Sequence, residues 1–122
     1  MNRTDLPTEI GTKVTNLHVP KRGIQSFLAF SGTLIAYYCS DPEQERNRWT
    51  NLYIFVTDSG KYVGISIGCT IIPHESDFVD CKVAESLEGL ISFFTVEGRR
   101  TGPSLRLFEQ VISMMKSGVE HV

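Results

Sequence analysis

The chain has 122 residues, of which 41% are hydrophobic and 21% are charged, and its formal net charge is −2. This length and composition predict one folded domain and exclude intrinsic disorder, which needs low hydrophobicity and high net charge. The charge argues against binding nucleic acid through its phosphates, and no apolar run approaches the roughly 20 residues that cross a membrane. Because the N-terminus also lacks a signal-peptide pattern, we expect a cytoplasmic protein without a nucleic-acid or membrane partner.

The first third of the chain predicts an irregular leader followed by two strands. Residues 1–11 are polar and show no period, so they form the leader of a single domain that spans residues 1–122. Residues 12–19 predict a first strand. Residues 26–38 are rich in aromatic and aliphatic side chains and predict a long strand that is bent or bulged at Gly32.

Two strand-like runs, residues 49–57 and 61–72, form the clearest predicted element. The sequence Asp-Ser-Gly at 58–60 separates them, which is a hairpin signal in which Gly60 can adopt a positive φ. Two registers fit this hairpin, because a three-residue loop with a bulge at Gly60 shifts the pairing by one residue. The pattern favours the register with one continuous aliphatic face, in which Val56 lies opposite Val63, Ile54 opposite Ile65 and Leu52 opposite Ile67.

Beyond Pro73 the apolar residues recur at helical spacing. With Asp80 as the N-cap, this spacing predicts an amphipathic helix. A second helix is predicted to begin at Pro103, directly after Gly102, and to end at Gly118. The apolar positions are Val83, Leu87, Leu90, Ile91 and Phe94 in the first helix and Leu105, Phe108, Val111 or Ile112, and Met115 in the second.

The order of these elements, strands first and helices last, predicts an α+β fold. We expect an antiparallel sheet of three to five strands with two C-terminal helices packed on one face. The helices should cover the aliphatic face of the hairpin. The opposite face should then carry the aromatic side chains of Tyr53 and Phe55, with Trp49 or Tyr62 beside them, and a partner has to cover them because large apolar patches are rarely bare on a monomer.

The cysteines indicate neither a set of disulfide bonds nor a metal site. Cys39, Cys69 and Cys81 are odd in number and show no paired spacing, so they predict free thiols in a reducing compartment. A cysteine nucleophile at Cys81 with His74 as its base is conceivable, but the neighbouring Asp80 opposes thiolate formation. We therefore expect no enzyme activity, no metal site and no cofactor.

Acidic side chains are concentrated between His74 and Glu97, where six carboxylates stand against the single amine of Lys82. Such a segment is typical of a solvated surface, and it also fits an acidic face presented to a basic partner. Together with the aromatic face it predicts binding to another protein and a homodimer. In the alternative interpretation, Tyr53 and Phe55 are core residues covered by the N-terminal segment. The predicted partner-binding residues are Trp49, Tyr53, Phe55, Glu85 and Glu88.

A succession of short segments from Trp49 onward extends over about half of the chain: Gly60-Lys61-Tyr62-Val63, Ile67-Gly68-Cys69-Thr70, His74-Glu75-Ser76-Asp77, and Val83-Ala84-Glu85 leading to Leu90-Ile91-Ser92-Phe93-Phe94. This succession resembles small accessory proteins of bacterial mobile elements, namely plasmids and integrative conjugative elements. Residues 95–101 depart from that pattern as an insertion. The resemblance implies a protein that binds host or element proteins, defence nucleases included, and it supplies no active residues.

Three functional hypotheses follow from the sequence. The leading one is a nonenzymatic small protein-binding module that modulates or inhibits a host defence protein. The second is an immunity protein or antitoxin that neutralises one cognate toxin. The third is a small-ligand domain or a cysteine-dependent enzyme that uses Cys81 and His74.

Overall fold

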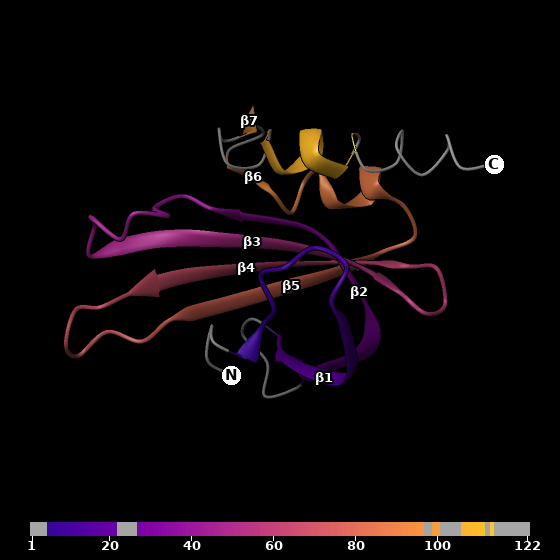
Figure 1. Cartoon of the computed structure of the whole chain (residues 1–122), viewed down its shortest axis with the longest axis horizontal. Helices are drawn as coiled ribbons and strands as arrows, with labels where there is room; N and C mark the ends of the chain where they lie inside the picture. The colour runs from indigo at the N-terminus through magenta and orange to yellow at the C-terminus, as the bar shows by residue number, and fades with distance from the viewer. Residues whose placement is uncertain (1–4, 22–26, 97–98, 101–105, 112, 114–122) are drawn as a thin grey trace.

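The computed structural model describes residues 5–21, 27–96, 99–100, 106–111 and 113, and consecutive strands form one antiparallel sheet of five (Figure 1). These strands are β1 (Lys13–Pro20), β2 (Phe27–Cys39), β3 (Arg48–Thr57), β4 (Tyr62–Thr70) and β5 (Phe78–Ala84), in the spatial order β1-β2-β3-β4-β5. A 3₁₀ turn, η2 (Leu87–Leu90), and a short ladder of β6 (Thr95–Val96) with β7 (Arg99–Arg100) follow. Residues 106–111 and 113 are helical and are called the C-terminal helix below.

The sheet is curled, so that its first strand approaches its last. The Cys81 thiol of β5 lies 3.7 Å from the carbonyl oxygen of Pro20 at the end of β1. Figure 1 shows β1 on one side of the central strands and the helical segments on the other. We call the side toward β1 the inner face and the side toward the helical segments the outer face.

Each face carries its own hydrophobic core, because side chains alternate between the two faces of a strand. The inner core joins Leu6 of the leader and Val19 of β1 to buried side chains of the other strands: Phe30, Leu34, Tyr53, Phe55, Val63, Ile65, Ile67 and Cys69. The outer core joins Ala36, Leu52 and Ile54 of the sheet to Leu90 and Phe94 near η2 and to Leu107, Phe108 and Val111 of the C-terminal helix.

The predicted register of the β3–β4 hairpin is wrong by one residue. Phe55 pairs with Val63 and Tyr53 with Ile65, so the aromatic and aliphatic side chains share the inner face. The turn explains the shift: the amide of Thr57 donates to the carbonyl of Lys61 at 2.8 Å, which closes a loop of three residues, and Gly60 has a φ of +88°. This is the pairing of the three-residue alternative. The pairing of β2 is irregular in two places: with β3 between Leu34 and Ala36, and with β1 next to Gly32, where the register shifts between Val14 and Leu17.

The expected α+β arrangement with two C-terminal helices is wrong as well. The first predicted helix is replaced by β5 and η2, because Val79 and Cys81 pair with Ile67 and Ile65 of β4 and pack against the inner core at a period of two. The C-terminal helix lies on the outer core and not on the face that holds Ile65 and Ile67; its predicted limits at Pro103 and Gly118 lie outside the described residues. No helix among the described residues has the length and apolar character needed to cross a membrane.

Candidate functional site

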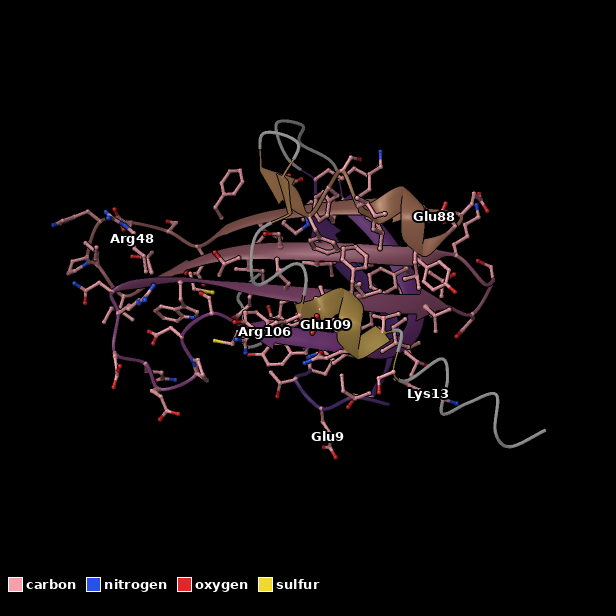
Figure 2. All side chains as sticks on the ribbon, turned by 90° about the horizontal axis from the view of Figure 1, so that it is seen from above. Glu9, Lys13, Arg48, Glu88, Arg106 and Glu109 are labelled. Atoms are coloured by element: carbon pink, nitrogen blue, oxygen red, sulfur yellow. The ribbon has the colours of Figure 1, made fainter. Side chains whose placement is uncertain are left out.

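Two loops meet at one end of the sheet, which we call the loop end: residues 40–47 between β2 and β3, and residues 71–77 between β4 and β5. The amide of Ile71 donates to the carbonyl of Asn47 at 3.0 Å, which joins the two loops. In Figure 2, viewed from the side of the helical segments, Arg48 marks this end and Glu88 lies toward the opposite end. A backbone hydrogen bond thus joins the two loops at the loop end.

A charged clamp joins β3 to the β4–β5 loop. The guanidinium of Arg48 contacts both carboxylate oxygens of Glu75, with Nε 3.0 Å from Oε1 and Nη2 against Oε2. The hydroxyl of Thr70 donates to the same Oε1 at 2.7 Å. The hydrogen bonds from Arg48 and from Thr70 lower the pKa of Glu75 to about 2, so this carboxylate is ionised at neutral pH.

The β2–β3 loop is shaped by Asp41, one of two buried polar residues in the described part of the chain. Its carboxylate oxygens accept the backbone amides of Glu45 at 3.1 Å and of Arg46 at 2.8 Å. A short acidic side chain can satisfy loop amides in this way because it reaches back to its own backbone. The carboxylate of Asp41 thus stabilises the conformation of its own loop through these two hydrogen bonds.

An open groove of about 660 Å³ lies on the outer face at the loop end, with Arg46, Thr50 and Gly68 among its lining residues. Two large apolar side chains also remain exposed at the loop end: Ile71 at 60%, in the β4–β5 loop, and Phe78 at 53%, at the start of β5. Phe78 pairs with Gly68 across the ladder, so its side chain is directed to the face that bears the groove. The loop end therefore presents an apolar surface next to a polar groove.

The predicted aromatic site is not an open surface. Tyr53 and Phe55 are both 0% exposed, and the Phe55 ring lies edge to face with Phe30 at 5.2 Å between centroids. Trp49 is half-buried and packs against the same inner core. β1 and the leader cover this face, as in the alternative interpretation, so Tyr53 and Phe55 offer a partner no surface unless the sheet opens.

The two predicted acidic residues lie away from these aromatic residues. Glu88 is exposed in the first turn of η2, and Glu85 is exposed between β5 and η2, where its carboxylate is 3.6 Å from the amine of Lys61. Figure 2 shows Glu88 far from the loop end. The structure does not bring the acidic and aromatic parts of the predicted site together, and the role of Glu85 and Glu88 stays a prediction.

Sequence reasoning missed Asn51, a buried amide on the inner face. Its Nδ2 donates to the hydroxyl of Tyr53 at 3.2 Å, but its Oδ1 has no hydrogen-bond partner among the described residues. A buried acceptor without a donor costs about 1–3 kcal/mol, so such an atom needs an explanation. The available signal was a polar amide among the mostly apolar side chains that run from Trp49 to Phe55.

The inner face around Asn51 also holds Tyr37, whose ring lies 5.2 Å from that of Tyr53. Burial, followed by the proximity of Cys39 and Tyr53, raises the pKa of the Tyr37 hydroxyl far above its ordinary value. Tyr37 is therefore a neutral phenol that can donate or accept a hydrogen bond.

The geometry does not support activation of Cys81. Burial and the neighbouring carboxylate of Asp80 raise the pKa of its thiol, which disfavours the reactive thiolate. His74 lies in the β4–β5 loop with a φ of +77°, whereas the thiol of Cys81 is directed at the carbonyl oxygen of Pro20 in β1. Within residues 5–21, 27–96 and the described part of the C-terminal region, no three His, Cys, Asp or Glu side chains group closely enough to hold a metal ion.

No family model, no curated protein and no solved structure matches this chain. The functional argument below therefore rests on the geometry of the loop end and of the edge of the sheet.

Proposed function

We propose that the protein is a nonenzymatic protein-binding module that contacts its partner through the loop end. The observation that carries this proposal is the exposure of two large apolar side chains at the loop end, Ile71 at 60% and Phe78 at 53%. Protein interfaces combine an apolar centre with a polar rim, and exposed apolar patches mark such sites. The proposed contact surface thus replaces the buried rings of Tyr53 and Phe55.

The charges around this surface favour a basic partner. The β2–β3 loop exposes the two carboxylates of Glu43 and Glu45 against the one guanidinium of Arg46, and none of these three groups forms an ion pair within the described part of the chain. The guanidinium of Arg48, by contrast, is occupied by Glu75. Free carboxylates at the rim attract a partner with basic side chains and accelerate its association.

The partner class rests on the resemblance to accessory proteins of mobile elements. We propose a modulator or inhibitor of a host defence protein, and the alternative is an immunity protein or antitoxin with one cognate toxin. Homodimerisation, with the apolar surface as the contact, is proposed for the state without a partner. The two predicted acidic residues, Glu85 and Glu88, would then serve as a separate acidic contact.

The test is affinity capture with a surface variant and a matched control. Phe78→Ser removes the exposed ring at the loop end, whereas Phe27→Ser removes a ring that is 63% exposed at the start of β2, outside the two loops. We expect a stoichiometric foreign protein with the wild-type chain and with Phe27→Ser, and its loss with Phe78→Ser. Equal recovery by all three chains would show that the loop end is not the contact, and molar mass from light scattering would report the dimer.

A further inference from the structure

β5 is the last strand of the sheet, and one of its two edges pairs with no strand of the described residues. It is also the one strand of this sheet that has no buried residue. β1 meets it at the thiol of Cys81, which packs on the inner face, and no ladder joins these two strands. The free edge of β5 is therefore a template on which another strand can form hydrogen bonds.

The backbone of β5 presents alternate residues at this free edge. The amide of Cys81 donates to the carboxylate of its neighbour Asp80 at 3.0 Å, so it is not used in the ladder with β4. The turn of the β3–β4 hairpin gives the same phase, because the bond from Thr57 to Lys61 directs odd-numbered residues of β4 toward β3 and even-numbered ones toward β5. The residues of β5 that direct N–H and C=O groups to the free edge are therefore Val79, Cys81 and Val83.

The side chains of β5 carry one charge of each sign on the outer face, at Asp80 and Lys82. In an antiparallel pair of β5 strands with Cys81 on the two-fold axis, Asp80 of each copy lies opposite the partner's Lys82. Moving the axis by one residue would place two Asp80 or two Lys82 side chains opposite each other, and like charges in that position are destabilising. The charges thus favour a single register for self-pairing.

The same register covers apolar side chains that are exposed in the single chain. Phe78 and Val83 are 53% and 39% exposed. With Cys81 on the axis, Phe78 lies opposite the partner's Ala84 and Val83 lies opposite the partner's Val79, at the short Cβ separations of cross-strand neighbours. The amide of Cys81 would exchange the carboxylate of Asp80 for a backbone carbonyl of the partner. Backbone, charges and apolar side chains therefore all fit a second copy of this strand.

We propose that two copies of this chain pair antiparallel through the free edges of β5, with Cys81 on the two-fold axis, to form one continuous sheet. Such a contact is closed, because both copies use the same surface. The proposal rests on the homodimer proposed above and specifies its contact, which includes Phe78 of the loop end. A dimer that used only Ile71 and Phe78 would not respond to the charges of Asp80 and Lys82, and the capture experiment above tests the foreign partner separately.

Charge reversal tests this register, with molar mass from light scattering measured over a series of concentrations. Asp80→Lys and Lys82→Asp should each raise the dissociation constant of the dimer about 10- to 100-fold, because each places like charges opposite each other. An equal mixture of the two variants should form a heterodimer, and the double variant Asp80→Lys/Lys82→Asp should form a homodimer, both as readily as the wild-type chain. The control Lys13→Asp, at an exposed lysine of the other edge strand β1, should leave the dimer unchanged.

Amide hydrogen exchange gives a second test that needs no variant. In the wild-type chain the amides of Val79 and Val83 should exchange more slowly as the concentration is raised through the range in which the dimer forms, whereas the amides of β1 should not. A wild-type chain that stays monomeric at millimolar concentration, a dimer that both single variants retain, or a mixture of the folded variants that stays monomeric would each overturn the proposal. Unchanged exchange at Val79 and Val83 in a wild-type dimer would overturn it as well, whether or not the variants fold.

Discussion

The outer face of the sheet is packed at one end and open at the other, and two glycines of β4 mark the difference. A Cβ at Gly64 would lie 2.9 Å from the Phe94 ring and 3.2 Å from Leu90, whereas a Cβ at Gly68 would meet nothing closer than Phe78 at 3.8 Å. Figure 2 shows helical segments over the first end and Arg48 at the second. One end is thus stabilised by close packing, and the other is held by hydrogen bonds that leave its surface available for binding.

The largest expected effect separates a core ring from an exposed ring. Phe55→Ala should lower the free energy of unfolding by about 3–5 kcal/mol, because it removes a fully buried ring from the inner core. Phe78→Ala, at a ring that is 53% exposed, should change it by no more than about 0.5 kcal/mol. Urea unfolding of the two variants measures both values. If Phe55→Ala left stability unchanged and abolished partner binding, the open aromatic face predicted from the sequence would be correct after all.

Phe55 shows what the sequence could and could not predict. The alternating pattern predicts β3 and β4 and the turn between them, and these strands are present. The pattern cannot decide which side chains of β3 lie on the inner face. Both sides of this strand are apolar, and a shift of one residue exchanges them. The loop of three residues that ends at Gly60 decides the register, and with it the burial of Tyr53 and Phe55.

The region after Pro73 was mispredicted for a related reason. Val79, Cys81 and Val83 alternate as in a strand, whereas Val83, Leu87 and Leu90 are spaced as in a helix, so local periodicity supports both structures. Pairing with β4, a tertiary contact, selects the strand. The sequence does not reveal the unpaired Oδ1 of Asn51 either, because its lack of a donor depends on which side chains surround it in the fold.

An intermediate effect on stability is expected when Gly64 or Gly68 is replaced by alanine. Gly64→Ala should lower the free energy of unfolding by about 1–3 kcal/mol, because the new methyl group overpacks the outer core against Phe94. Gly68→Ala has room for its methyl group and should be neutral or stabilising by up to about 1 kcal/mol, since alanine loses less backbone entropy on folding. Urea unfolding of both variants tests the comparison within one strand. Equal destabilisation would mean that both ends of the outer face are packed.

The smallest effect is expected at the charged clamp of the loop end. The pKa of Glu75 is lowered from 4.5 to about 2, so its ionised form is favoured by folding. The resulting stabilisation is fully present above about pH 4.5 and is lost as the pH falls toward 2. Urea unfolding at a series of pH values should therefore show a shallower decline between these limits in Glu75→Gln than in the wild-type chain.

Removing the other half of the clamp gives the control for this prediction. Arg48→Gln should flatten the same part of the pH curve less than Glu75→Gln does, because the hydrogen bond from Thr70 still lowers the pKa of Glu75, and the double variant should match Glu75→Gln. Thr70→Val deletes only the hydroxyl donor and should have a smaller effect. Added salt should weaken the clamp, since both side chains are exposed to solvent. Parallel pH curves for the wild-type chain and Glu75→Gln would mean that the loop end is held by its backbone hydrogen bonds, with no contribution from the ion pair.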